Sequence, residues 1–476
     1  MKTRSFVTIC FLAYLTITIA STNAALAQTK SSTIDGSWLG KLKTQGVELR
    51  LVFNISKASD NTLKSTLDSP DQGAKGIPLG KTTWDGKSLN IEAANMAASF
   101  AGSMINDSTI DGTWTQAGVG YPIKMVKQSK VLVLNRPQEP KPPFSYLAEE
   151  VTITNKKFGF NLGGTLTLPK GSGPFPSVVL ITGSGQQNRD EEIFDHKPFL
   201  VIANYLTNRG FAVLRCDDRG VGKSKGSLVN VTSYDFSTDI QAAVDFLKGD
   251  KRIDGNKIGL LGHSEGGLIA QIVATERNDI AFIVSLAGPG IKGENILLDQ
   301  NVVIPRLMGA PESEIESMAE MNKGMYKILE DENDNNKAQQ QITIFLRDYL
   351  TKQKETDIEE KITSIINGFP LRAYSWLRYF LLSDPSKYLE KIKCPVLALN
   401  GSKDVQVIAK SNLPAIEKSL KSNGNKDVTV IELKDLNHLF QHCKTGLTNE
   451  YGAVEETFSE EALQTIGDWL SKRFLL

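Results

Sequence analysis

The feature that most constrains this chain is the stretch 258–270, where an apolar run leads into a turn with glycines at positions 262 and 266 around Ser264. The apolar run predicts a buried strand, and residues 268–274 after the turn predict a helix. A turn this sharp holds its central residue at a strained backbone angle, and side chains at positions 262 and 266 are expected to collide with neighbouring elements. The fold must therefore place a strand, a tight turn and a helix around Ser264.

This strand, turn and helix pattern predicts a nucleophile elbow, in which the turn lifts the Ser264 hydroxyl out of the sheet edge. The helix that follows directs its N-terminal amides toward an anion forming beside the serine. Gly-x-Ser-x-Gly by itself also fits an ordinary turn. Because a predicted strand precedes the motif and a predicted helix follows it, we favour a catalytic serine.

The length of 476 residues predicts two or three domains. Lys and Arg together number 54, as do Asp and Glu, so the formal net charge is zero. This balance gives no overall electrostatic attraction to nucleic acid or to an anionic membrane. We therefore expect the partner to be a small molecule.

Residues 1–27 predict a signal peptide, because Lys2 and Arg4 precede an apolar run over 6–20 and a small-x-small site ends at Ala27. An uncleaved membrane anchor is the alternative, but the run is short for a span and is interrupted by Thr and Ser. We expect cleavage near Ala27 and export to the periplasm or the cell exterior, with no stable membrane anchor.

Residues 28–130 contain short alternating segments separated by Gly, Asn and Asp, which predicts antiparallel strands in a small barrel or sandwich. Two Gly-x-Trp motifs make this region similar to the lipocalin-like accessory domains that precede some secreted hydrolases. Such a domain could bind a glycan or an envelope ligand. The region contains three tryptophans, which could line a groove for that ligand. Core packing is the more common role for a tryptophan on the inner face of a strand, and we favour it for Trp38, Trp84 and Trp114.

Residues 131–148 predict a linker, because four prolines within 136–143 favour an extended chain that cannot pair into a sheet. In residues 149–476, apolar runs alternate with helical stretches, which predicts an α/β domain with a mostly parallel sheet and helices on both faces. Ligands of such sheets lie at the carboxyl ends of the strands. The predicted strand runs are residues 176–181, 212–215, 258–261, 280–286, 396–399 and 428–431.

The interval from about residue 290 to 392 lacks a strand run and contains charged helical stretches. It predicts a helical cap above the strand ends. An aromatic cluster in this interval has helical spacing, and packing between helices is its default role. Trp376 of that cluster is our candidate for a contact with the substrate.

A serine hydroxyl needs a base to take its proton and a carboxylate to orient that base. The chain has four histidines. His263 adjoins Ser264 and is expected to point away from it, and His196 precedes a helix, where a surface or capping role is the default. We favour His438, in the loop after the last predicted strand, over His442, which is expected to be only a neighbour of the site.

The acid should follow the preceding strand, and Asp404 lies in the loop directly after residues 396–399. Asp435 is the competitor, but it precedes the base by three residues and would have to fold back along one loop. The resulting order of Ser264, Asp404 and His438 is that of a nucleophile-elbow hydrolase.

The tetrahedral intermediate also needs two amide donors. We expect one from Glu265, at the helix start, and the other from Ser184, in a loop where Gly183 lets the backbone approach the substrate. An ordinary glycine turn is the alternative for that loop. The turn at residues 215–224 lacks the glycine spacing of nucleotide-binding motifs. No His, Cys or Asp cluster has metal-ligand spacing.

From about residue 151 to 476 the chain resembles the α/β-hydrolase superfamily, and within it the serine-aminopeptidase-like and dienelactone-hydrolase-like carboxylesterases. The motifs that carry the resemblance are Gly183-Ser184-Gly185 with Arg189-Asp190-Glu191, Asp218-Arg219-Gly220, Gly262-His263-Ser264-Glu265-Gly266, Gly401-Ser402-Lys403-Asp404 and Asn437-His438-Leu439-Phe440. The resemblance implies the fold and a Ser-His-Asp triad, but it is unspecific for substrate.

The first hypothesis is an exported serine carboxylesterase that works through an acyl-enzyme on Ser264 and requires no cofactor. The same machinery could instead cleave peptides, with cap residues Glu312, Glu314 or Glu316 binding a free amino terminus. A third hypothesis is a catalytically silent scaffold whose β domain binds an envelope partner.

Overall fold

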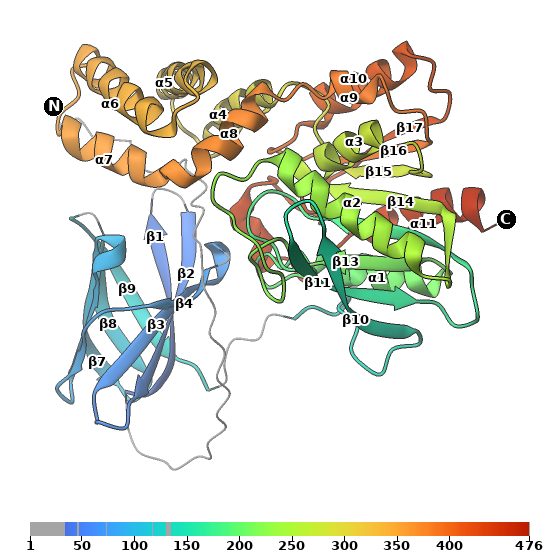
Figure 1. Cartoon of the computed structure of the whole chain (residues 1–476). Coiled ribbons are helices and arrows are strands. Elements are labelled where there is room, and N and C mark those ends of the chain that lie inside the picture. The colour runs from blue at the N-terminus through green and yellow to red at the C-terminus, as the bar shows by residue number, and fades with distance from the viewer. Residues whose placement is uncertain (1–33, 45–46, 73, 117, 130–134, 476) are drawn as a thin grey trace.

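The computed structural model describes residues 34–44, 47–72, 74–116, 118–129 and 135–475. The expected signal peptide, residues 1–27, lies outside the described residues, as do residues 131–134 of the predicted linker. Two sheets organise the chain, one of nine strands in the N-terminal part and one of eight strands in the C-terminal part (Figure 1).

The N-terminal sheet is a closed antiparallel barrel. Pairing of β2 with β3 closes a ring in the order β2-β1-β9-β8-β7-β6-β5-β3, and β4 adds to the edge of β3. Of the two architectures expected from the sequence, the barrel is therefore the one observed. The strands are β1 (Gly36–Thr44), β2 (Val47–Lys57), β3 (Leu63–Ser69), β4 (Ala74–Pro78), β5 (Thr82–Trp84), β6 (Ser88–Ala93), β7 (Ala98–Asn106), β8 (Thr109–Gln116) and β9 (Val119–Lys127).

Large aromatic side chains fill the barrel interior. Trp38 and Trp114 are 0% and 2% exposed. The ring of Phe53 contacts that of Phe100 edge to face, with centroids 5.1 Å apart. Trp84 is half-buried and packs against the same cluster. These tryptophans are core residues, as side chains on the inner face of a small barrel usually are.

The C-terminal sheet has the order β10-β11-β13-β12-β14-β15-β16-β17. The first two strands form an antiparallel hairpin, and β12 to β17 are parallel. Every apolar run predicted as a strand overlaps one of these strands. The bounds are β10 (Leu147–Asn155), β11 (Phe160–Leu168), β12 (Phe175–Ile181), β13 (Ala212–Cys216), β14 (Ile253–His263), β15 (Ile283–Leu286), β16 (Val396–Gly401) and β17 (Val428–Leu433).

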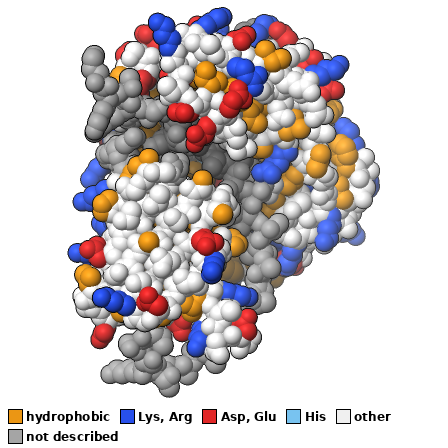
Figure 2. Space-filling view, turned by 90° about the vertical axis from the view of Figure 1, so that its left-hand side faces the viewer, with side chains coloured by type: hydrophobic (Ala, Val, Ile, Leu, Met, Phe, Trp, Pro, Cys, Tyr) orange, Lys and Arg blue, Asp and Glu red, His pale blue; other side chains and the backbone are white. Residues whose placement is uncertain are grey.

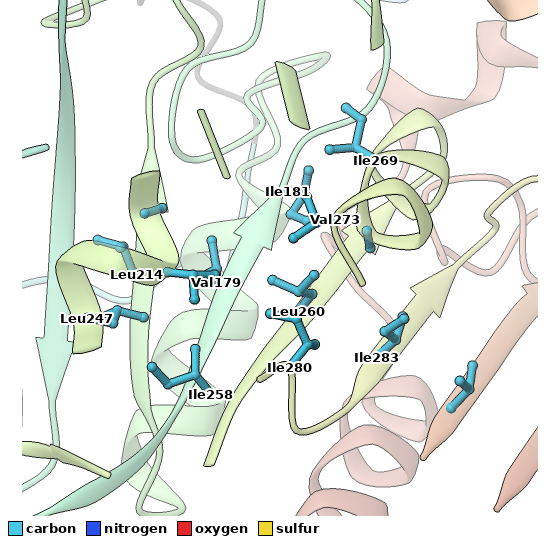
Figure 3. Close-up of a cluster of buried hydrophobic side chains, with 14 of the residues drawn as sticks. Val179, Ile181, Leu214, Leu247, Ile258, Leu260, Ile269, Val273, Ile280 and Ile283 are labelled. Atoms are coloured by element: carbon cyan, nitrogen blue, oxygen red, sulfur yellow. The ribbon is translucent and has the colours of Figure 1, made fainter. Parts of the chain in front are cut away.

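Helices cover both faces of this sheet, as the alternation of strands and helices predicts. On one face, α2 (Ser233–Gly249), α3 (Glu265–Glu276) and α10 (Ala409–Ser422) pack on strand residues such as Val179 and Leu260 (Figure 3). On the other face, α1 (Pro198–Asn208) and α11 (Glu460–Phe474) pack on the alternate residues Val178 and Leu261. Because both faces are buried, the central strands β12 and β15 consist almost entirely of buried residues.

A helical insertion lies between β15 and β16, within the interval expected to form a cap. It has its own apolar core, which includes Leu329, Ile342 and Tyr374. None of the described helices combines the length and the apolarity needed to cross a membrane. The inserted helices are α4 (Gly293–Leu307), α5 (Glu312–Asp331), α6 (Asn335–Lys352), α7 (Ile358–Gly368), α8 (Tyr374–Leu382) and α9 (Ser386–Leu389).

The described part of the linker is fixed to the C-terminal domain. The Arg136 guanidinium donates to the carbonyl oxygens of Phe194, Asp195, Gly452 and Val454 at 2.7 to 3.2 Å. The barrel also contacts this region, because a Cβ on Gly452 would lie 2.5 Å from the carbonyl oxygen of Pro70.

On the face shown in Figure 2, basic and acidic side chains are interspersed, without a broad patch of either sign among the described residues. This distribution agrees with the formal net charge of zero.

Candidate active site

Ser264 occupies a strained turn between β14 and α3. Its backbone angles are φ 52° and ψ −121°, a combination rare for a residue with a side chain. The turn is held because the Ser264 amide donates to the carbonyl oxygen of Leu286 at 2.8 Å. A Cβ on Gly262 would lie 2.1 Å from the Gly266 oxygen, and one on Gly266 would lie 2.2 Å from the Ile181 oxygen. The predicted need for small residues at both positions is confirmed.

The structure brings Asp404 and His438 together from the loops after β16 and β17. His438 Nδ1 lies 2.8 Å from Asp404 Oδ2, and each residue is 4% exposed. The two loops can meet because position 401 is glycine: a Cβ there would lie 2.2 Å from the carbonyl oxygen of Leu436. A buried histidine and carboxylate therefore lie at the carboxyl end of the parallel sheet.

The hydrogen bonds around Asp404 determine the His438 tautomer. Asp404 Oδ2 also accepts from Asn400 at 3.0 Å, and Oδ1 accepts from the amides of Gln406 and Val407 at 2.8 and 2.9 Å. A carboxylate surrounded by donors acts as an acceptor, so His438 Nδ1 carries the proton that faces it. His438 Nε2 is then left with a lone pair that can take a proton.

Asn437 fixes the loop that carries His438, and its role was missed in the sequence. It is fully buried, and its Oδ1 accepts from the amides of Leu439 and Gln441 at 2.9 and 3.0 Å. An Asn directly before the candidate base, in a loop where its side chain can accept from nearby backbone amides, is the signal that could have revealed it.

The other candidates for acid and base lie elsewhere. Asp435 is on the surface, where it pairs with Lys403 at 3.0 Å. His442 is also exposed and pairs with Glu456 at 2.9 Å.

The expectation of a surface or capping role for His196 is wrong. It is fully buried, with Nδ1 3.0 Å from Thr457 Oγ1 and Nε2 2.9 Å from the carbonyl oxygen of Tyr451. Burial lowers the pKa of His196 to about 4, and the nearby Arg136 adds to this effect. The Lys197-Pro198 sequence gave no sign of this burial, because the residues that bury His196 lie more than 250 positions further along the chain.

The backbone amides of Ser184 and Glu265 make no hydrogen bond within the described residues. The amide of Gly183, by contrast, donates to Glu191 Oε1 at 2.7 Å. Asp218 stabilises the loop that carries Ser184, because its carboxyl oxygens accept from Thr182 Oγ1 at 2.8 Å and from the Gln187 amide at 2.9 Å. Burial raises the pKa of Asp218 to about 8.

Trp376 of the cap contacts the helix that begins at the serine turn. Its indole Nε1 donates to Glu265 Oε1 at 2.8 Å, and the same oxygen accepts from Ser233 Oγ at 2.5 Å. Burial raises the pKa of the Glu265 carboxyl. A pocket beside the turn is lined by Gly183, Glu265 and Ile269, among others. Trp376 thus lies where the cap meets the residue that follows Ser264.

His263 lies in a polar cluster that sequence reasoning did not predict. Its Nδ1 is 2.9 Å from Glu191 Oε1, and its Nε2 is 2.9 Å from the carbonyl oxygen of His438. Glu191 belongs to the resemblance motif Arg189-Asp190-Glu191, but nothing in the sequence indicated its partner. Within the described residues, no group of three His, Cys, Asp or Glu side chains is arranged to hold a metal ion.

Comparison with known proteins gives a family match over part of the chain. The model of the family described as "Serine aminopeptidase, S33" matches residues 197–352. Esterase EstD of Thermotoga maritima is 28% identical over 298 residues, which are 62% of this chain and 61% of EstD. The peroxisomal succinyl-coenzyme A thioesterase of Mus musculus is 29% identical over 146 residues, or 30% of this chain and 31% of the thioesterase. The chain thus spans less than two thirds of either relative.

Among solved structures, the Pyrococcus furiosus esterase Pf2001 aligns with a TM-score of 0.43 at 17% identity, over 72% of this chain and 99% of the esterase. Est1E of Butyrivibrio proteoclasticus, solved with ferulic acid, aligns with a TM-score of 0.40 at 18% identity, over 68% of this chain and 96% of Est1E. The sheet order and the strained serine turn after β14 are those of an α/β-hydrolase fold. The family model and EstD show that the chain is similar to an aminopeptidase family and to an esterase.

Proposed function

We propose that the protein is a serine hydrolase that cleaves carboxylic esters through an acyl-enzyme on Ser264. The observation that carries this proposal is the buried hydrogen bond between His438 and Asp404 at the strand ends. In the first step Ser264 Oγ attacks the ester carbonyl while His438 Nε2 takes its proton, and His438 then gives that proton to the leaving alcohol. In the second step His438 takes a proton from water, whose oxygen attacks the acyl carbon. The bond between that carbon and Ser264 Oγ then breaks, His438 returns the proton to Ser264 Oγ, and the acid is released.

Asp404 would hold His438 in the required tautomer and stabilise its imidazolium form. The unpartnered amides of Ser184 and Glu265 would donate to the oxygen that becomes negative in the tetrahedral intermediate. We assign Gly183 and Trp376 to the walls of the substrate site. These steps require no cofactor.

A peptidase is the second candidate, because the matching family model is that of a serine aminopeptidase. The same triad can attack an amide. Glu312, Glu314 and Glu316 are poor candidates for binding an amino terminus, because they lie near the start of α5, where Glu312 and Glu316 are exposed and Glu312 pairs with Arg306. Glu265 is the better candidate in this case, since it is buried, adjoins Ser264 and accepts from the neutral groups of Ser233 and Trp376.

We also propose that residues 1–27 direct export, which would place the enzyme in the periplasm or outside the cell.

The packing of the barrel limits where it could bind a ligand. A glycan or envelope ligand would have to bind the outer surface, because Trp38 and Trp114 fill the interior. A catalytically silent scaffold is the least favoured alternative, since such a protein would have no use for the His438 and Asp404 pair.

The test is hydrolysis of p-nitrophenyl esters of graded acyl length, compared with aminoacyl p-nitroanilides, by the mature chain. We expect ester turnover that disappears in Ser264→Ala, with anilides turned over much more slowly. Faster turnover of the anilides would favour the peptidase. Full ester turnover by a folded Ser264→Ala variant would contradict the mechanism.

A further inference from the structure

His263 and Glu191 form a second buried pair of a histidine and a carboxyl group directly behind the proposed catalytic site. They are 6% and 3% exposed. A Cβ on Gly183 would lie 3.2 Å from Ser264 Cβ, 3.3 Å from Glu191 Oε1 and 3.5 Å from His263 Nδ1. The pair therefore adjoins both the serine turn and the loop that carries Ser184.

The two ring nitrogens of His263 face groups that accept hydrogen bonds. Nε2 faces the carbonyl oxygen of His438, which can only accept. Nδ1 faces Glu191 Oε1, which already accepts from the Gly183 amide. A neutral imidazole has only one N–H, so it could satisfy one of these contacts but not both. Both contacts are satisfied when the ring carries two protons.

We propose that His263 is a buried imidazolium and that His263 and Glu191 are positioning residues. The two N–H groups of the ring would tie the Glu191 carboxylate and the main chain of His438 to the turn that carries Ser264. This positioning role rests on the proposed hydrolysis, because it consists of holding His438 and the Ser184 loop at fixed positions relative to Ser264. The protonation state is a separate claim that can be tested without substrate.

The strain at Glu191 supports a positioning role. Its φ is 50°, a left-handed conformation that is unfavourable for a residue with a side chain. The conformation places one carboxyl oxygen within reach of both the Gly183 amide and the His263 ring. Such strain persists only where surrounding contacts hold it.

The charged and titratable groups around the His263 ring determine the pH range in which the ring is charged. Glu191 faces it from the loop after β12, and Asp404 and His438 face it from the loops after β16 and β17. The other neighbours are apolar and include Phe199, Ile202, Leu286 and Leu439. Burial alone would lower the pKa of His263, but the Glu191 carboxylate, the two hydrogen bonds and Asp404 outweigh it and raise the pKa above 6.5.

Because the pKa of His263 is raised, the proposed charge persists to higher pH than in a free histidine and is lost as the pH rises through the raised pKa. Glu191→Gln keeps an oxygen that can accept from Gly183 but removes the negative charge. Loss of an opposite charge at this distance lowers a histidine pKa by about 1–3 pH units. The substitution should therefore move the loss of the second proton toward neutral pH.

The first experiment measures the nitrogen chemical shifts of the histidines in the wild-type protein by NMR. The chain has four histidines, so a single substitution assigns each signal. At pH 7.5 we expect two protonated nitrogens for His263 and one for His196, whose Thr457 partner can donate to the unprotonated nitrogen. A neutral His263 would overturn the proposal.

The second experiment compares pH profiles of kcat and KM for the wild type and Glu191→Gln, with Glu456→Gln as the matched control. Glu456 forms a histidine pair of the same length, 2.9 Å, but on the surface. We expect Glu191→Gln to lower kcat on the order of 10²-fold at alkaline pH, with little change in KM, because the base loop is misplaced. The alkaline decline in kcat should begin at lower pH than in the wild type, and Glu456→Gln should match the wild type.

Two outcomes would contradict the positioning role. One is a Glu191→Gln profile reduced equally at every pH, which indicates a structural effect alone. The other is a wild-type protein with a doubly protonated His263 but no hydrolytic activity. That result would refute the proposed function and the positioning role with it, while leaving the charge assignment in place.

Discussion

The barrel and the hydrolase domain both pack apolar strand faces into a dense core, but they differ in the polar groups that they bury. Buried polar side chains of the N-terminal domain form hydrogen bonds with other side chains of that domain. Ser65 pairs with Thr82 at 2.6 Å, and Asp71 pairs with Arg50. In the hydrolase domain, buried acids and histidines gather at the carboxyl ends of the parallel strands. Burying such groups is unfavourable unless they are hydrogen-bonded. The concentration of Asp404, His438 and Glu265 at this end of the sheet is therefore where we place the proposed chemistry.

The sharpest test of this contrast removes the nucleophile. Ser264→Ala deletes one half-buried oxygen without changing the packing of α3, so the melting temperature should stay close to that of the wild type. We expect kcat for ester hydrolysis to fall on the order of 10⁶-fold. Steady-state kinetics and calorimetry on the same preparation check both parts, and unchanged turnover would place the chemistry elsewhere.

Asp404→Asn should produce the next largest loss. The amide can donate to His438 Nδ1 and stabilise the wrong tautomer, which leaves Nε2 protonated and unable to act as a base. We expect kcat to fall on the order of 10⁴-fold. Asp435→Asn is the matched control, because Asp435 lies in the next loop but pairs with Lys403 on the surface. An equal loss in both variants would argue against a specific role for Asp404.

Trp376→Phe should have a modest effect on the site. The variant keeps the aromatic ring and its stacking on Phe380 but loses the hydrogen bond to Glu265. A hydrogen bond contributes about 0.5–1.5 kcal/mol, and about 1.5–3 kcal/mol when one partner is charged. We expect kcat/KM to fall by about tenfold, mainly through KM, because the bond joins the cap to the core. A change in kcat alone would show that Trp376 does not contribute to substrate binding.

Trp114→Ala should have the smallest effect on turnover and a large effect on stability. Deleting this buried side chain leaves a cavity in the barrel and should lower the free energy of unfolding by about 3–5 kcal/mol. Below the unfolding transition, kcat/KM should match that of the wild type. Chemical denaturation and kinetics at the same temperature would test this, and a loss of turnover in the folded variant would mean that the barrel supports the site directly.

Much of the hydrolase domain could be predicted from local sequence patterns. The glycines at 262 and 266 and the apolar run before them identify the serine turn, because backbone contacts at that turn exclude side chains. The loops that hold Asp404 and His438 could be located because each follows an apolar strand directly. The short alternating strands of the barrel were likewise evident from their period.

Most of what could not be predicted depends on contacts between distant segments. His196 precedes a helix in the sequence but is buried by residues 451 and 457, and no local pattern shows this. Glu191 and His263 are 72 residues apart, and their pairing follows from the loop after β12 folding back over the serine turn. Asn437 orients its loop through its own side chain, a short-range effect that a search for catalytic residue types overlooked.

The most direct test of the central claim is labelling of the mature protein with a fluorophosphonate, followed by mass spectrometry of the modified peptide. Only a serine with an activated hydroxyl reacts at stoichiometric yield. We predict a single adduct on Ser264 that is absent in His438→Ala and present in His442→Ala, whose histidine lies on the surface. A folded wild-type protein without an adduct, or with equal labelling in His438→Ala, would contradict the proposal that His438 activates Ser264.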